Sequence, residues 1–445
     1  MSRSMTSGSP SKALLLFAIP LILGNIFQQA YSLADSIIVG NFVGANALAA
    51  VGTTASLTFL FIAVATGTGI GSGVLISQLF GAKEFGRMKT TIYTSLISIF
   101  AISVILTILG LILCRPILVL MQTPENIMND AEDYLNIYFL GMVFLFMYNI
   151  VNSIFNALGE SKKTLFFLII ASILNIFLDL LFVVKFNMGV RGVAIATLIS
   201  QVLCSLISFL FLLAKLRQFK EFKDFSYFDI QTLSSVAKLA IPSVIQQSTV
   251  SIGLILVQSL VNSYGSVVVA GYTAATKIDG VAIMPMVNVG NAMSTFAAQH
   301  IGAKKQERIP KGLRTSFIMA CSIGLLIAGI VYLSGESLVA LFMDSSANVD
   351  SIKIGVEYLR VVSISYFIMG LLNVTNGTIR GGGDMKNFML ITFLNHLVRV
   401  SFAYIFSFIF GYSAIWWGLP AGWTVSFIFS YIVYKKGNWL KKSIY

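Results

Sequence analysis

The chain has 445 residues, of which 57% are hydrophobic and only 11% are charged, and its formal net charge at pH 7 is +12. Because soluble domains carry roughly 25% charged residues, this composition excludes a soluble globular protein and indicates one embedded in a membrane. At about 20 apolar residues per spanning helix, the length suffices for about twelve spans with their loops.

Long apolar runs follow one another along the chain, and each predicts a membrane-spanning helix. The twelve runs cover residues 14–38, 48–76, 90–114, 133–157, 164–184, 190–213, 236–263, 272–298, 313–334, 355–378, 387–410 and 414–434. Several contain Gly or Pro, which spanning helices tolerate. We therefore expect an all-α integral membrane protein of twelve transmembrane helices, whose first helix itself directs insertion.

Basic residues are distributed unevenly between these runs. If both termini are cytoplasmic, 23 of the 30 Lys and Arg residues fall inside, and only five fall outside: Arg115, Lys185, Arg191, Lys353 and Arg360. Cytoplasmic loops carry such an excess of basic residues. This distribution predicts a multi-pass protein of a bacterial or archaeal cell (inner) membrane, with both termini cytoplasmic. It also accounts for the net charge of +12, so no nucleic-acid partner is expected.

The two halves of the chain resemble each other at an offset of 221–224 residues. Gln78-Leu-Phe-Gly-Ala-Lys83 recurs as Gln299-His-Ile-Gly-Ala-Lys304, and Tyr134-Leu135 recurs as Tyr358-Leu359. Repeats of six spans enter the membrane from the same side and are related by a pseudo-two-fold axis along the membrane normal. We expect an N-terminal six-helix lobe over residues 1–213, a cytoplasmic linker over 214–235 and a C-terminal six-helix lobe over 236–445, with substrate bound between the lobes.

Polar residues inside the apolar runs are functional candidates, because a charge at the bilayer centre costs roughly 3 kcal/mol or more. Asp35 lies near the outer end of the first run, and Asp179 follows Asn175 by one helical turn, so that Asn175 and Asp179 share a helix face. Two carboxylates in one low-dielectric pocket cannot both ionise comfortably, so the pair suits proton transfer. The same oxygens, with those of Asn and Thr side chains, also suit Na⁺.

The second half has no acids at the matching positions, which places the predicted cation-coupling site in the first half. Its residues are Asp35, Asn152, Asn175, Asp179 and Thr197. Structural alternatives remain open: Asp35 as a helix-end residue at the outer interface, Asn152 as an interhelical hydrogen-bonding group and Asp179 as a buried structural partner.

Other polar or flexible side chains are candidates for the substrate cleft. These are Gln28, Asn149, Gln246, Lys277, Asp279, Met286, Asn373, Asn376 and Arg399. Lys277 and Asp279 either line a cavity of the C-terminal lobe or reach the outer surface, and Arg399 pairs with an acid or a carbonyl group. The three cysteines and two histidines show no metal or catalytic spacing, so we expect no enzyme, no cofactor and no metal other than Na⁺ at the coupling residues.

Four segments carry a resemblance to a known family. They are Ala34-Asp-Ser-Ile-Ile-Val-Gly40, Gln78-Leu-Phe-Gly-Ala-Lys83, Asn175-Ile-Phe-Leu-Asp179 and Ala298-Gln-His-Ile-Gly-Ala-Lys304. Through these segments, which are spread along both halves, the chain resembles the multidrug and toxin extrusion (MATE) transporters, and the resemblance covers essentially its whole length. The resemblance implies antiport of amphipathic, often cationic, drugs or toxic metabolites against H⁺ or Na⁺ by alternating access, with the cation bound at the five coupling residues.

One branch of that family uses carboxylates in its seventh and tenth helices. Here the seventh run offers Gln246, Gln247 and Gln258 and no acid, and the acid of the tenth, Glu357, lies at its outer edge. This departure favours a DinF-like branch, centred on Asp35, over a NorM-like one.

Three rival functions are weaker. A flippase for lipid-linked saccharides or other lipids would need a more cationic cavity. An enzyme would need a nucleophile and base, or a metal, at membrane depth. Titratable groups on one lobe fit coupled transport better than they fit a channel. We expect a monomer in the lipid bilayer that binds a small amphipathic substrate.

Overall fold

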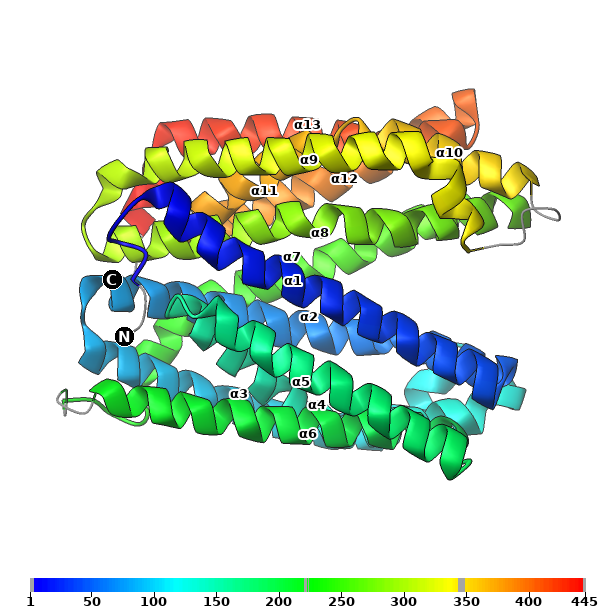
Figure 1. Ribbon diagram of the computed structural model, residues 1–445, viewed down its shortest axis with the longest axis horizontal. Coiled ribbons are helices and arrows are strands. Elements are labelled where there is room, and N and C mark those ends of the chain that lie inside the picture. Colours follow the sequence, from blue (N-terminus) through cyan, green and yellow to red (C-terminus); the bar gives the residue numbers. More distant parts are fainter. Residues whose placement is uncertain (1–3, 220–221, 223, 343–348, 443–445) are drawn as a thin grey trace. The chain divides into compact units, whose positions relative to one another are not determined.

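The computed structural model describes residues 4–219, 222, 224–342 and 349–442, and the regular structure of these residues is entirely helical (Figure 1). The first half contributes α1 (Pro10–Ile38), α2 (Ala45–Ala82), α3 (Phe85–Leu120), α4 (Glu125–Ala157), α5 (Ser161–Asp179) and α6 (Gly189–Leu216). The second contributes α7 (Ile230–Asn262), α8 (Ser266–Gly302), α9 (Ile309–Ala340), α10 (Val349–Ser363), α11 (Tyr366–Gly381), α12 (Met385–Phe410) and α13 (Ser413–Lys436).

All twelve predicted runs coincide with helices of this set. Ten of the described helices are long and apolar enough to cross a membrane, and the bent pair α10 and α11 together makes an eleventh span. The last helix, α13, has 24 residues, which is long enough to cross the hydrocarbon core, but its Trp, Tyr and Gly residues dilute its apolar character. The all-α, twelve-span architecture in two lobes is confirmed.

The tenth predicted run, 355–378, is not one straight helix. It divides into α10 and α11, whose axes differ by 50°. No proline lies at the break, but the Ser365 hydroxyl donates to the Val362 carbonyl at 2.7 Å. Serine hydroxyls that bond backbone carbonyls bend helices, and an apolar run of uniform hydropathy gives no sign of this competition.

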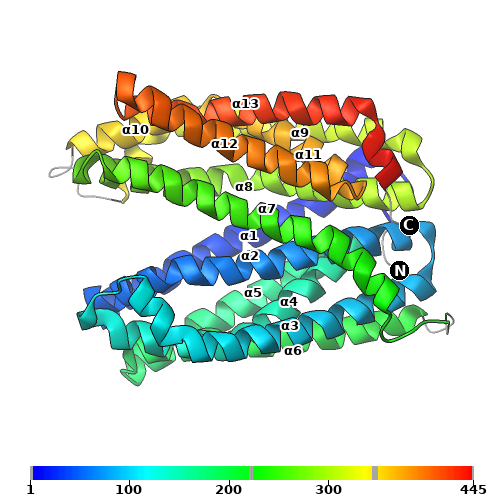
Figure 2. The same cartoon turned by 180° about the vertical axis from the view of Figure 1, so that it is seen from behind.

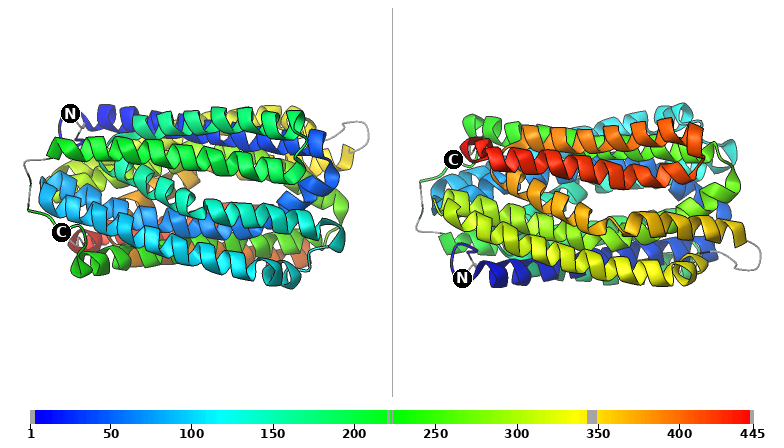
Figure 3. Two further views of the ribbon diagram at one scale, coloured as in Figure 1. Left: turned by 90° about the horizontal axis from the view of Figure 1, so that it is seen from below. Right: turned by 90° about the horizontal axis from the view of Figure 1, so that it is seen from above.

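The described residues form two compact units, each treated separately below. The N-unit comprises Leu23–Phe80 and Glu84–Val244, and the C-unit comprises Ser4–Ile22, Gly81–Lys83 and Ile245–Tyr445. In the N-unit, α4 packs against both α3 and α6 (Figure 2). In the C-unit, α12 and α13 run side by side (Figure 3), and α8 packs against α9, α10 and α11. The lobe boundaries at residues 213 and 236 stay a prediction.

Glycines bring helices into close contact inside both units. A Cβ atom on Gly71 of α2 would lie 2.4 Å from the backbone nitrogen of Ala240 in α7. A Cβ atom on Gly377 of α11 would lie 2.1 Å from the Gly290 carbonyl oxygen of α8. Small residues that let helix backbones approach are typical of packing within membranes.

The segment between α6 and α7 lies along α3 of the N-unit. The Lys89 ammonium group donates to the Phe222 carbonyl at 3.1 Å and lies 3.6 Å from the centre of the Phe225 ring. Asp229 then caps α7, because its carboxylate accepts the Thr232 backbone N–H at 2.7 Å. Hydrogen bonding by Thr232 lowers the pKa of Asp229.

Both ends of the described chain pack near the C-terminal end of α8. The Met5 backbone N–H donates to Gln299 Oε1 at 2.9 Å. Trp439 is buried and lies beside Gly382. The preceding residue, Gly381, packs so closely on α8 that an added Cβ atom would meet Ala297 and Ala298. The two ends therefore share one end of the C-unit (Figure 1).

Candidate functional site

The predicted coupling residues come from α1, α4, α5 and α6, and all of them belong to the N-unit. Asp179 has no exposed surface, and Asn175 is 2% exposed. Each acid stands at or near the start of a π-helical stretch: Asp35 precedes η1 (Val39–Val43), and Asp179 precedes η2 (Leu180–Lys185). These two stretches contact each other, and π-helical turns occur frequently at functional sites.

The two carboxyl groups face each other closely enough to interact. Yet Oδ1 of Asp35 and both carboxyl oxygens of Asp179 are buried without an ordinary hydrogen-bond partner, as are the side-chain oxygens of Asn152 and Asn175. Buried polar atoms normally have partners, so this concentration of free acceptor oxygens requires an explanation. Oxygen atoms are the ligands that hard cations prefer, so the chemistry of this group fits the cation site expected from the sequence.

Thr197 joins the cluster from α6. Its hydroxyl accepts the Asn175 side-chain N–H at 3.4 Å. The side-chain oxygen of Asn175 takes no part in this bond and has no hydrogen-bond partner. The structure thus brings Asp35, Asn175, Asp179 and Thr197 together. Asn152 contributes another unpartnered oxygen from α4 and contacts Tyr148 on the same helix.

Two tyrosines that sequence reasoning missed border the acids. Tyr31 and Tyr134 lie within electrostatic reach of both Asp35 and Asp179, and Tyr31 also contacts Thr197. Two signals were available. Tyr31 precedes Asp35 by four residues, which places both on one helix face, and Tyr134 belongs to the repeated Tyr-Leu pair.

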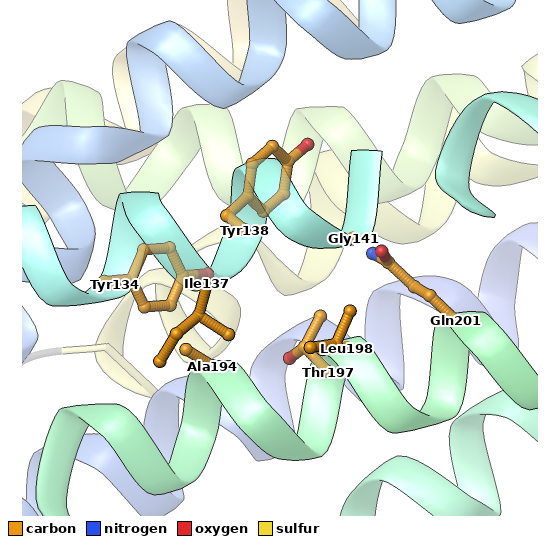
Figure 4. A pocket seen from close by; sticks show the side chains of 8 residues that line it. All are labelled: Tyr134, Ile137, Tyr138, Gly141, Ala194, Thr197, Leu198 and Gln201. Carbon is orange, nitrogen blue, oxygen red and sulfur yellow. The ribbon is translucent and has the colours of Figure 1, made fainter. Parts of the chain in front are cut away.

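A narrow crevice reaches Thr197 between α4 and α6. Figure 4 shows its lining, with Tyr134, Ile137, Tyr138 and Gly141 on α4 and Ala194, Thr197, Leu198 and Gln201 on α6. The Tyr138 hydroxyl is buried without a partner. The crevice therefore connects Thr197 with a lining of mixed apolar and polar side chains on these two helices.

The remaining candidates are distributed over both units. Gln28 and Asn149 lie in the N-unit, where the Asn149 side chain donates to the Leu145 carbonyl at 2.8 Å. In the C-unit, Gln246 and Asn376 are buried, and each has an unpartnered side-chain oxygen. The Asn373 side chain donates to the Met369 carbonyl at 2.9 Å.

Met286 is fully buried in the hydrophobic core of the C-unit. As with the other candidates, its place in a substrate cleft stays a prediction.

Lys277 and Asp279 have different surroundings. Lys277 is exposed and lies 5.7 Å from the centre of the Phe342 ring. Asp279 is 8% exposed and accepts hydrogen bonds from the hydroxyls of Tyr366 and Tyr358, at 2.8 and 3.3 Å. Arg399, also buried, lies within electrostatic reach of Asp279.

Histidine and cysteine provide no metal centre in the described ranges, where no group of three or more His, Cys, Asp or Glu residues gathers. His300 Nδ1 is 2.8 Å from the Phe296 carbonyl of its own helix.

Eleven apolar spans among the described residues, counting the bent α10–α11 pair as one, together with α13 and a buried acidic cluster in the N-unit, define a multi-pass membrane protein built like a transporter. The MatE family model matches residues 20–181 and 242–405, one stretch in each half of the repeat, and the chain belongs to this family. The resemblance inferred from the sequence is confirmed.

Curated relatives support the same family. "Probable multidrug resistance protein YoeA" of Bacillus subtilis is 31% identical over 446 residues, covering 97% of this chain and 95% of the relative. "Probable multidrug resistance protein YpnP" of the same organism is 29% identical over 435 residues, covering 98% and 97%.

Solved structures agree with them. One titled "Crystal structure of MATE in complex with MaL6" superposes with a TM-score of 0.92 at 25% identity and covers 99% of each chain. An outward-facing multidrug resistance MATE family transporter superposes with a TM-score of 0.90, also at 25% identity, and covers 97% of this chain and 96% of its own. These relatives are named as transport proteins rather than as enzymes.

Proposed function

We propose that the protein is a cation-coupled antiporter that exports amphipathic, often cationic, compounds by alternating access. One observation carries the proposal: the paired carboxyl groups of Asp35 and Asp179 are buried in the N-unit beside unpartnered amide oxygens. The relatives' names as multidrug resistance proteins support export of drugs or toxic metabolites.

In the proposed cycle, H⁺ or Na⁺ enters from outside and binds at the carboxyl pair, and its release inside is coupled to outward movement of the substrate. Thr197 orients Asn175 through the 3.4 Å hydrogen bond, so the Asn175 oxygen can face the ion. The phenolic groups of Tyr31 and Tyr134 supply donors for a carboxylate that has lost its ion. A ligand set centred on Asp35 supports the DinF-like branch over the NorM-like one.

The cellular arrangement is proposed with it. The excess of basic residues on one side and the shared location of both chain ends support cytoplasmic termini in an inner membrane. We propose a monomer that functions within the bilayer.

Cellular drug accumulation tests the proposal. Cells that express Asp35→Asn should accumulate ethidium to the level of cells lacking the transporter, whereas wild-type cells keep it low. The matched control is Asp350→Asn, because that carboxylate is 81% exposed and pairs with the surface residue Lys353. Efflux by Asp35→Asn at the wild-type rate, with equal membrane expression, would refute the assigned coupling role.

A further inference from the structure

The C-unit contains a buried acid that the proposed coupling cycle does not use. Asp279 of α8 accepts the Tyr358 hydroxyl from α10 and the Tyr366 hydroxyl from α11. Ser363 ends α10, and Tyr366 begins α11. One carboxylate therefore binds both sides of the 50° bend.

Aromatic packing holds the Tyr358 side of this connection. The Tyr358 ring lies edge-on to Tyr272, at 5.6 Å between ring centres, and to Trp416, at 5.3 Å. Tyr272 and Trp416 stack on each other at 5.5 Å. Because Tyr358, Tyr366 and Trp416 are at most 1% exposed, the hydroxyls of both tyrosines are confined near Asp279.

The charge of Asp279 is balanced within the same cluster. Arg399 of α12 lies within electrostatic reach of both Asp279 and Tyr272. A buried charge persists only when it is paired and hydrogen-bonded, and here three helices, α10, α11 and α12, supply the partners of Asp279. Each carboxyl oxygen of Asp279 accepts one tyrosine hydroxyl, unlike the unpartnered oxygens of Asp179 in the N-unit.

The bend sets the direction of α11, which carries Asn373 and Asn376. The Asn376 side-chain oxygen is buried without a partner, and a backbone contact between Gly377 and Gly290 holds α11 against α8. We infer that Asp279 is a positioning residue: it fixes the bend between α10 and α11 and so orients the polar face of α11. The consequence for substrate binding rests on the proposed function, whereas the bend itself does not.

The repeat supports this assignment independently. Tyr134 and Tyr358 are equivalent positions of the two halves. Tyr134 borders Asp35 and Asp179 in the N-unit, and Tyr358 bonds Asp279 in the C-unit. Each unit thus places the same tyrosine beside its own buried acid, although the acids themselves stand at non-equivalent positions.

Distance measurement between two spin labels tests the bend directly. Labels at Lys353→Cys on α10 and Lys386→Cys just beyond α11 occupy exposed positions, after the three native cysteines are replaced. The helices α10 and α11 have 15 and 16 residues and rise about 1.5 Å per residue. If the 50° bend between them straightens, the distance between their outer ends increases by up to about 4 Å. Tyr358→Phe with Tyr366→Phe should lengthen and broaden the distance distribution.

The matched control is Tyr404→Phe, which removes a tyrosine hydroxyl bonded at 3.2 Å to the Leu256 carbonyl in the same unit. Its distribution should equal that of the parent. Equal distributions for the parent and the Tyr358→Phe, Tyr366→Phe double variant would overturn the inference. This readout is independent of transport, so it stands even if Asp35 proves not to couple ions.

Ethidium transport into everted vesicles separates positioning from general damage. Tyr366→Phe should raise the apparent KM several-fold with little change in Vmax, and Asp279→Asn, which keeps one acceptor oxygen, should be milder than Asp279→Leu. A loss of Vmax at unchanged KM, with equal effects of Asn and Leu, would overturn the positioning role.

Discussion

At the scale of single residues, the proposed function rests on two acids, Asp35 and Asp179, which the structure places near each other in the N-unit. Asp35 and Asp179 were identifiable because acids are rare in the apolar runs. Their mutual approach depends on the contact between the η1 and η2 segments, which no spacing rule predicts. Tyr31 and Tyr134 escaped notice because tyrosine is common in membrane helices and carries no charge to mark it.

Asp179→Asn should uncouple ion movement from drug export. The substitution keeps the side-chain volume but removes the charge that shares the site with Asp35. Ion-driven ethidium uptake into everted vesicles should fall at least tenfold, whereas Asp133→Asn, at a surface pair with Arg191, should transport normally. Uptake by Asp179→Asn at the wild-type rate would exclude a shared carboxyl site.

Thr197→Val should weaken ion binding without abolishing transport. The change removes the hydroxyl that accepts the Asn175 N–H, so the amide oxygen loses its fixed orientation. The ion concentration for half-maximal transport should rise several-fold at unchanged maximal rate. Thr53→Val, where the hydroxyl donates to the Ala49 carbonyl of its own helix, is the control, and identical ion dependence of the two variants would count against Thr197.

At the scale of helices, periodicity and hydropathy predict which segments span, but not how closely they pack. Apolar runs underestimate several helices, because α2 and α8 continue to Ala82 and Gly302, through the polar ends where the motif residues lie. The break between α10 and α11 was missed for a related reason: it depends on a serine hydroxyl and on tertiary bonds to Asp279, not on Pro or Gly.

Gly71→Ala should destabilise the protein by about 1–3 kcal/mol, the usual cost of overpacking. Its new methyl group would press on the Ala240 backbone, which cannot move aside like a flexible side chain. Gly52→Ala in the same helix meets nothing within 4 Å and should be neutral. Thermal unfolding in detergent compares the two, and equal melting temperatures would contradict the close α2–α7 contact.

At the scale of the whole molecule, the apolar runs and the repeat predict a twelve-span, two-lobed protein, and the fold confirms it, whereas the orientation expected from the charge distribution stays a prediction. The particular substrate could not be predicted from the sequence, because apolar Met and Phe side chains fit the shape of an apolar compound and do not distinguish one such compound from another. The coupling ion was also beyond it, because oxygen ligands accept either H⁺ or Na⁺.

The proposed topology predicts opposite accessibility for two exposed lysines. A membrane-impermeant thiol reagent should label Lys353→Cys in intact cells and Lys386→Cys only after permeabilisation. The reason is that one membrane span, the bent α10–α11 pair, separates the two positions. Labelling of Lys386→Cys in intact cells would place both termini outside.

Reconstituted transport tests the central claim most directly. Purified protein in proteoliposomes should move ethidium against an imposed H⁺ gradient or an imposed Na⁺ gradient, each applied separately at zero membrane potential. Asp35→Asn should lose this dependence in matched vesicles, whereas Asp350→Asn should keep it. Ethidium movement that ignores both gradients in the wild-type protein, or that follows a gradient equally well in Asp35→Asn, would contradict cation-coupled antiport through the N-unit site.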